Sequence, residues 1–124
     1  MQTQTLVQER RISVRTNLLG VAAKISKDGW KWEDIETCDV SDGGLGFIAE
    51  TEYPVGEKLL LEGEASDFAR GMDISCDIRV VFAGEKDGKY LYGVRFLNMS
   101  KAQRTGLSIF IELLVTKYPS LLLQ

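Results

Sequence analysis

Apolar and polar residues alternate along most of the chain between Leu18 and Leu97, and turn-forming residues interrupt the alternation at short intervals. Successive side chains of a β-strand point to opposite faces, so this pattern predicts strands that bury one face. We expect strands at residues 19–25, 30–38, 44–50, 57–63, 74–82 and 90–96. The pairs Asp28-Gly29 and Asp87-Gly88 tolerate the positive φ angles of tight turns and therefore predict two hairpins.

The pattern changes after the last of these strands. Ser100 and Gln103 have the spacing of a capping box, which marks the start of a helix. Apolar residues then recur on one helical face until Pro119 ends the run, at Leu107, Phe110, Ile111, Leu114 and Tyr118. We expect this face to cover the open end of the β-domain.

Six short strands joined by tight turns favour an antiparallel barrel or sandwich, and a barrel leaves no exposed strand edge. We therefore expect a mainly β fold, a six-stranded antiparallel β-barrel followed by a C-terminal helix. In this division residues 1–17 form a flexible N-terminal segment, residues 18–98 the barrel, and residues 99–124 the helix and its tail.

The predicted helix carries more apolar residues than one packing face requires. Ile109 and Leu113 lie nearly opposite the face that is expected to be buried, and residues 121–123 add a tail of three leucines. The helix is therefore also a candidate surface for a homodimer or for a protein partner.

Composition narrows the chemistry that is open to the chain. It has 124 residues, of which 44% are hydrophobic, and it contains no histidine. Catalysis by Ser-His-Asp or Cys-His groups and most zinc and iron sites need histidine, so we expect no catalytic residues, no metal site and no enzyme. Cys38 and Cys76 have no cysteine or histidine at metal-ligand spacing and are expected to be buried free thiols.

The hydropathy and charge of the chain argue against membrane-spanning, secreted and nucleic-acid-coating proteins. No run approaches the roughly 20 apolar residues of a membrane span, and the polar N-terminus lacks the apolar centre of a signal peptide, so we expect a cytoplasmic protein. The formal net charge is −3. Proteins that coat DNA or RNA are usually basic, so neither is an expected partner.

The net charge conceals a basic N-terminal part. Five basic residues against one acidic residue precede Asp28, and three of them are Arg10, Arg11 and Arg15, ahead of the first expected strand. A guanidinium presents a rigid fork of donors that fits phosphate oxygens and the O6 and N7 edge of guanine. A solvated basic tail is the alternative interpretation.

A second segment, residues 39–44 with the sequence Asp-Val-Ser-Asp-Gly-Gly, joins the second and third expected strands. Asp39 can accept hydrogen bonds from the N1–H and amino groups of a guanine, and the Ser41 hydroxyl can both donate and accept. Gly43 and Gly44 would let a ligand approach the backbone closely. Alternatively, the Asp and Ser side chains cap the backbone of their own turn.

Together these segments resemble the ligand motifs of the PilZ domain family, small bacterial receptors for cyclic di-guanylate (c-di-GMP). Residues 11–15 (Arg-Ile-Ser-Val-Arg) match the motif Arg-x-x-x-Arg, and residues 39–44 match Asp/Asn-x-Ser-x-x-Gly. The later segment 92–96 (Tyr-Gly-Val-Arg-Phe) also suits the family. The resemblance extends from about Gln8 to Leu97 and implies the family's six-stranded antiparallel barrel.

The resemblance implies a nucleotide-binding site for c-di-GMP and no other cofactor. Arg11 and Arg15 would grip guanine edges and phosphates of the ligand. Arg10 resembles the position that influences whether one ligand or a stacked pair binds, and an arginine there favours the pair. The surface that holds one guanine would be lined by Asp39, Ser41, Gly43 and Gly44.

We therefore expect a receptor in bacterial second-messenger signalling, with motility and biofilm control as processes typical of the family. The N-terminal arginine segment would be mobile without ligand, order on the ligand and present a new surface to a protein partner that the sequence does not name. A different class stays open, a PilZ-like β-barrel interaction module that acts through its helix without binding nucleotide.

Several residues that could carry chemistry are left outside the expected site. Trp30 and Trp32 are two residues apart, so a strand would point both to one side, and packing in the core or on the sheet is expected over stacking on a base. The acidic run from Glu33 to Asp42 is interpreted mostly as the solvated face of a hairpin. Arg79 and Arg95 are expected to pair with acids on the surface, although either could reach the ligand.

Overall fold

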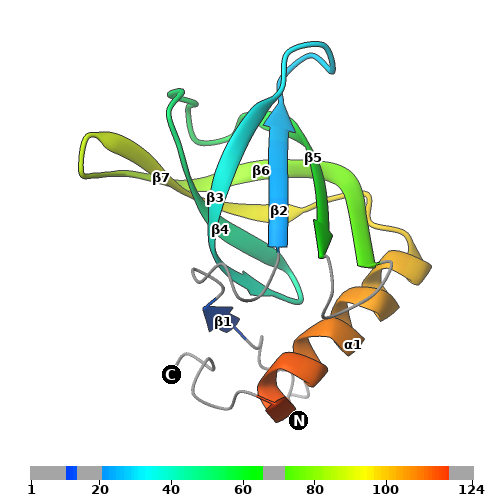
Figure 1. Ribbon diagram of the computed structural model, residues 1–124. Helices are drawn as coiled ribbons and strands as arrows, with labels where there is room; N and C mark the ends of the chain where they lie inside the picture. The colour runs from blue at the N-terminus through cyan, green and yellow to red at the C-terminus, as the bar shows by residue number, and fades with distance from the viewer. Residues whose placement is uncertain (1–10, 14–20, 66–71, 118–124) are drawn as a thin grey trace, which may run out of the picture.

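The computed structural model describes residues 11–13, 21–65 and 72–117. Figure 1 shows strands wrapped around one interior, with a single helix lying at one end of them. The elements are β1 (Arg11–Ser13), β2 (Val21–Ser26), β3 (Glu33–Ser41), β4 (Gly44–Ala49), β5 (Lys58–Ala65), β6 (Met72–Lys86), β7 (Lys89–Phe96) and α1 (Lys101–Lys117).

Strands β2 to β7 form a closed antiparallel barrel in the order β3-β2-β5-β6-β7-β4, because β4 pairs back with β3. The expected six-stranded antiparallel barrel with a C-terminal helix is confirmed. β1 adds a three-residue strand that the alternation of the sequence does not predict. It pairs with residues 39–41 of β3. The same edge of β3 pairs with β2 at residues 33–35, and the other edge pairs with β4.

The barrel is filled by the inward-facing residues of its strands. Alternate positions at the end of β7 are buried, so the period of two that predicted this strand also predicted its inner face, whereas β4 is buried at five of its six positions. Phe47 and Tyr92 are the largest of the fully buried side chains, and their ring centroids lie 5.5 Å apart. Cys38 and Cys76 are buried free thiols, as expected.

The loop between β2 and β3 corrects the interpretation of the tryptophans. Gly29 has a φ of +85°, and the Asp28 carboxylate accepts hydrogen bonds from Trp30 N at 2.8 Å and Lys31 N at 3.1 Å. These bonds lower the pKa of Asp28 and hold residues 27–31 outside the strand. Trp30 is consequently 88% exposed, whereas Trp32 is partly buried under the ammonium group of Lys24.

The β6–β7 hairpin forms at the expected turn, where Asp87 and Gly88 have φ angles of 52° and 82°. The expectation that Phe82 lies on the inner face of its strand is wrong. The pairing of β6 with β7 shifts between Val80 and Phe82, and this β-bulge reverses the alternation of the strand. Val80 is buried, but Phe82 is 54% exposed on the outer face.

Helix α1 begins at the expected cap, since the Ser100 hydroxyl accepts a hydrogen bond from Gln103 N at 3.1 Å. The Gln103 side chain does not complete a capping box, because its oxygen accepts from Ser75 N of β6 at 3.0 Å. The expected inner face is buried at Leu107, Phe110 and Ile111. The side chain of Leu114, together with Tyr118, Pro119 and the leucine tail, lies outside the described residues.

Candidate functional site

Residues 39–44 form the end of β3, a two-residue turn and the first residue of β4. Ser41 is buried, and its hydroxyl donates to the carbonyl oxygen of Gly44 at 3.2 Å. The carbonyl oxygen of Gly43 accepts from Phe96 N at 2.9 Å, which ties the turn to β7. The Ser side chain therefore caps its own turn, as the alternative interpretation of this segment holds.

Strand β1 brings the first motif beside the second. In the antiparallel register Arg11 stands opposite Ser41, and Ser13 stands opposite Asp39. The backbone of the arginine segment therefore starts within one strand spacing, about 4.8 Å, of the residues that are expected to hold guanine. Arg10, Arg15 and the side chain of Arg11 lie outside the described residues.

Gly44 is required by the closure of the barrel. It pairs with Arg95 of β7, and a Cβ atom at Gly44 would lie 1.9 Å from the carbonyl oxygen of Val94. No side chain fits at that distance, so the backbones of β4 and β7 can approach this closely only at a glycine. The neighbouring Gly43 is exposed in the turn.

The next outward position of β4 is Gly46, which stands opposite Gly93 of β7. We call these two residues the glycine floor, because they leave the outer face of two adjacent strands without side chains. The Asp39 carboxylate borders the floor on one side, since a Cβ at Gly46 would lie 2.8 Å from Asp39 Oδ2. Phe82 borders the other side, its own Cβ lying 3.4 Å from where a Cβ of Gly93 would stand.

Gly44 belongs to a row of residues that are paired across neighbouring strands, and the other members of this row are basic. Arg95 pairs with Gly44, Arg79 pairs with Arg95, and Lys58 of β5 pairs with Arg79. Arg79 donates to the carbonyl oxygen of Gly56 at 2.9 Å, and Lys58 lies 3.8 Å from a carboxylate oxygen of Asp77. Arg95 is exposed. It is thus the cation nearest to the 39–44 turn in this row.

The sequence did not place Phe82, Gly93 and Arg95 at the site. They come from the β6–β7 hairpin, about 40 to 55 positions away from Asp39 along the chain, and only the closure of β7 onto β4 brings them there. The segment 92–96 was a sequence signal for this strand, but its neighbour in the barrel could not be read from alternation.

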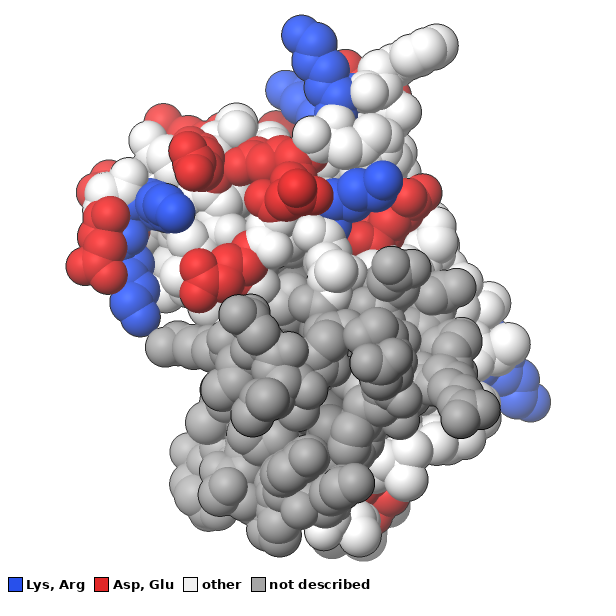
Figure 2. Space-filling model, in the orientation of Figure 1, with Lys and Arg blue, Asp and Glu red and all other residues white. Residues whose placement is uncertain are grey.

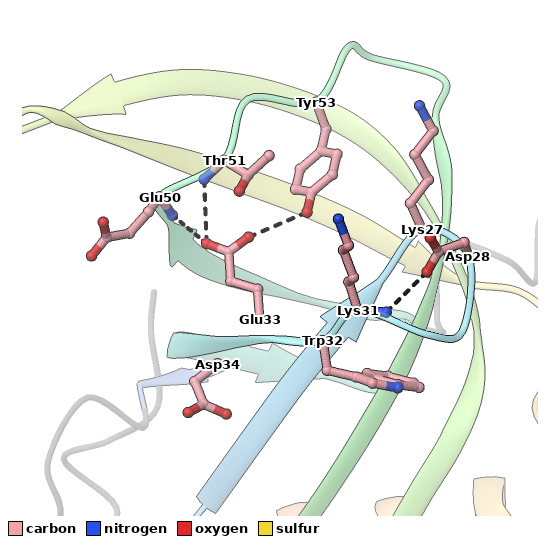
Figure 3. A pocket seen from close by; sticks show the side chains of 9 residues that line it. All are labelled: Lys27, Asp28, Lys31, Trp32, Glu33, Asp34, Glu50, Thr51 and Tyr53. Carbon is pink, nitrogen blue, oxygen red and sulfur yellow. Dashed lines mark hydrogen bonds between the residues drawn. The ribbon is translucent and has the colours of Figure 1, made fainter.

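A cavity of about 630 Å³ lies at the opposite end of β3 and contains none of the expected site residues (Figure 3). Its polar centre is Glu33, whose carboxylate accepts from Glu50 N at 2.6 Å, Thr51 N at 3.2 Å and the Tyr53 hydroxyl at 3.2 Å. Burial, and next the charge of Glu33, raise the pKa of Tyr53. The cavity is lined by Lys27, Asp28, Lys31, Trp32, Glu33, Asp34, Glu50, Thr51 and Tyr53.

Glu33 therefore departs from the expected solvated acidic face, because it holds the loop after β4. Asp34 and Glu36, on the same strand, are exposed as expected. Figure 2 shows acidic side chains over the described part of the barrel surface in this view, with basic side chains among them and at the tip above them. Among the described residues no three His, Cys, Asp or Glu side chains are grouped so that they could hold a metal ion. No helix in the described ranges is long and apolar enough to cross a membrane.

Fold and site together define an antiparallel β-barrel domain whose outer face joins an arginine segment to an Asp-Ser-Gly turn. The PilZ domain family matches residues 9–113, and the chain belongs to this family. Comparison with curated proteins gives no match.

Three solved structures with the same fold illustrate the family. YcgR from Escherichia coli in complex with c-di-GMP has a TM-score of 0.74 at 18% identity, over 92% of this chain and 48% of its own. MotI/DgrA, the inhibitor of motility from Bacillus subtilis, has a TM-score of 0.70 at 15% identity, over 90% of this chain and 53% of its own. The PilZ domain of E. coli YcgR with c-di-GMP has a TM-score of 0.66 at 20% identity, over 92% and 95%. The chain thus spans about half the length of YcgR and MotI/DgrA.

Proposed function

We propose that this chain is a receptor for c-di-GMP and binds it on the outer face of the barrel, over the glycine floor. The observation that carries the proposal is the register of β1, which sets Arg11 opposite Ser41 and so joins the two ligand motifs. Two of the structures with the same fold, YcgR and its PilZ domain, are described in complex with c-di-GMP, and this supports the same ligand here.

The glycine floor suits a guanine base. Guanine is flat and carries its N1–H and amino donors on one edge, so it needs a bare surface with an acceptor at the border. Gly93, which is partly exposed, supplies the bare surface, and the Asp39 carboxylate lies over the buried Gly46 beside it. In the proposed complex Asp39 accepts from the guanine edge, while Ser41 and Gly44 keep the turn in place beside it.

The two phosphates of the ligand require cations. We propose that Arg11 and Arg15 bind the phosphates and guanine edges from the β1 side, and that Arg10 favours a stacked ligand pair. Arg95 supplies a further cation from β7, on the far side of Gly44 from Ser41. Each charge-assisted hydrogen bond contributes about 1.5–3 kcal/mol, so the loss of one arginine should weaken binding by at least about tenfold.

We further propose that the ligand orders the arginine segment and thereby creates a surface for a protein partner. β1 is the shortest described strand and pairs only with β3, so few backbone hydrogen bonds hold it. The protein would then act in the cytoplasm as a receptor and not as an enzyme. The name of MotI/DgrA, an inhibitor of motility, favours motility as the regulated process.

Calorimetric titration with c-di-GMP tests the proposal. We expect binding by the unaltered chain and none by the double variant Arg11→Ala, Arg15→Ala. Arg104→Ala removes an exposed arginine from α1 and serves as the matched control, which should bind normally. Absence of heat from the unaltered chain at tens of micromolar would reject the proposal, and recovery of intact dinucleotide after incubation would separate a receptor from a hydrolase.

Hydrogen exchange tests the ordering of the arginine segment. The amides of residues 11–13 should exchange more slowly when c-di-GMP is bound, whereas amides in β5 should not change. Equal exchange at residues 11–13 with and without bound ligand would reject the switch but leave ligand binding intact.

A second function, a barrel that binds a partner without nucleotide, is favoured by the exposed apolar residues of α1. Ile109 and Leu113 are 54% and 45% exposed on the helix side that faces away from the barrel. The same titration distinguishes the two functions, because an interaction module would give no heat with c-di-GMP.

A further inference from the structure

The side of α1 that faces away from the barrel carries a stripe without charged residues. Ile109 and Leu113 are exposed there, and smaller residues precede and follow them along the same side, because helix positions three, four and seven apart share a face. Figure 1 shows α1 at the end of the barrel, with one side turned away from the strands. We define the outer stripe as Ala102, Thr105, Gly106, Ile109, Leu113 and Thr116.

The outer stripe is asymmetric in side-chain size. Its N-terminal half consists of Ala102, Thr105 and Gly106, and its C-terminal half contains the large apolar residues Ile109 and Leu113. A helix that packs against this stripe in the opposite direction with the same sequence would set large residues over small ones. Two such helices can therefore approach closely without voids or overlap.

The charged residues beside the stripe have the same asymmetry. Lys101 flanks its N-terminal half, and Glu112 flanks its C-terminal half on the same side. In an antiparallel pair related by a two-fold axis, residues on one side of the stripe stay on the same side of the interface. Glu112 would then approach the partner's Lys101, whereas a parallel pair would place these charges on opposite sides.

We propose that α1 forms a homodimer by packing its outer stripe antiparallel against the same stripe of a second copy. One register satisfies every condition, with the two-fold axis near position 107. Ile109 then packs over the partner's Thr105, and Leu113 packs over the partner's Ala102. The charge of Lys101 faces the partner's Glu112 in the same register. The complementarity is the argument for a second copy as the occupant, because each feature of the stripe finds its counterpart in the stripe itself.

The contact is short. In this register the facing parts of the two stripes extend from Ala102 to Leu113, which is 12 positions or about 18 Å of helix at 1.5 Å per residue. An interface of one helix pair is smaller than that of most stable dimers. The dimer is therefore weak and forms in proportion to concentration, and the inference does not depend on the ligand of the barrel.

Sedimentation of the full chain over a wide concentration range tests the dimer. We expect monomer at low micromolar concentration and dimer at several hundred micromolar. Ile109→Gln and Leu113→Gln should each weaken dimerisation at least tenfold. Val81→Gln is the matched control, since Val81 is 51% exposed on β6, and it should dimerise normally. A chain that stays monomeric at several hundred micromolar, or variants that dimerise as well as the control, would overturn the inference.

Charge exchange tests the antiparallel direction. Glu112→Lys alone should weaken the dimer at least threefold, because it brings like charges together. Combining it with Lys101→Glu should restore the dimer. The two changes place an acid near the helix N-terminus and a base nearer its C-terminus, which the helix dipole favours, so they should not unfold α1. Failure of the combined variant to recover while its helix content and melting temperature are normal would reject the arrangement.

Spin labels on the helix give the direction independently. In the proposed register two copies of a label at Thr105 are offset by only about 7 Å along the helix axis, whereas labels at Thr116 are offset by about 26 Å. A parallel pair would give equal distances at the two positions. The native thiols do not interfere, because Cys38 and Cys76 are buried and burial raises the pKa of Cys76 to about 11.

Discussion

Replacing Gly46 with alanine should disturb the proposed ligand surface without unfolding the barrel. The added Cβ would lie 2.8 Å from Oδ2 and 3.1 Å from Oδ1 of Asp39, which are the end of a side chain that can rotate. At Gly44 the added Cβ would lie 1.9 Å from the carbonyl oxygen of Val94, which cannot move without displacing β7. Alanine substitutions at these two glycines, which are two residues apart, should therefore have opposite outcomes for the stability of the fold.

The magnitudes follow from which atom must move. Turning Asp39 out of its favoured rotamer costs about 0.5–1.5 kcal/mol, and the change from glycine to alanine recovers about 0.4–1 kcal/mol through the unfolded chain. Gly46→Ala should therefore change the free energy of unfolding by less than about 1 kcal/mol. Gly44→Ala should cost about 3 kcal/mol or more, because β4 and β7 must separate. That loss corresponds to a melting temperature lower by roughly 10 °C.

Gly46→Ala should weaken ligand binding although it changes stability little. Displacing the Asp39 carboxylate from the floor removes acceptors of charge-assisted hydrogen bonds, each worth about 1.5–3 kcal/mol, so Gly46→Ala should bind c-di-GMP at least about tenfold more weakly. Calorimetric melting and titration measure both quantities. Gly63→Ala in β5 is the control, since the added Cβ would lie 3.4 Å from the carbonyl oxygen of Ala22 in β2. A folded Gly46→Ala variant with unchanged affinity would refute Asp39 as the guanine acceptor.

Three further outcomes are expected. Arg95→Ala should weaken c-di-GMP binding about tenfold, and Arg79→Ala, whose side chain donates to Gly56, should weaken it less, as titration will show. Glu33→Gln should lower the free energy of unfolding by about 1–3 kcal/mol, because the carboxylate accepts from two amides and a hydroxyl, while the exposed Asp34→Asn should be neutral in thermal melts. The pKa of Cys76 is raised from 9.0 to about 11, so the folded state keeps its proton while the unfolded thiol ionises; stability should fall as the pH rises from about 9 to 11, and less so in Cys76→Val.

The six barrel strands and the helix could be predicted because each of them buries one face. Alternation over six or more residues locates β2, β4 and β7, and turn residues with positive φ separate β6 from β7. β1 could not be predicted this way, because three residues do not show a period. Trp30 was assigned to a strand because the hydrogen bonds of Asp28 to the loop backbone leave no trace in an apolar pattern.

The candidate site likewise has one part that a local motif indicates and another part that depends on the fold. Asp39, Ser41 and Gly44 stay predicted ligand-binding residues, and they were singled out because their motif is contiguous in the chain. The other border of the glycine floor depends on which strand closes the barrel beside β4, and that is a property of topology and not of local pattern. A β-bulge decides the side of Phe82, since one extra residue in β6 turns it from the interior to the floor.

The free energy that holds β1, the described part of the arginine segment, at the end of β3 is small. Ordering three residues costs about 3–6 kcal/mol of backbone entropy, whereas each backbone hydrogen bond of β1 returns only about 0.5–1.5 kcal/mol. The pairing of β1 with β3 is thus near balance by itself. Two or three charge-assisted contacts between arginines and a ligand, at about 1.5–3 kcal/mol each, are enough to decide it. β2 leaves this edge of β3 after residue 35, so the edge beside Asp39 and Ser41 accepts β1 without competition from the barrel. In the proposed switch the barrel therefore remains unchanged, while the ligand controls β1, the described strand that is not part of the closure.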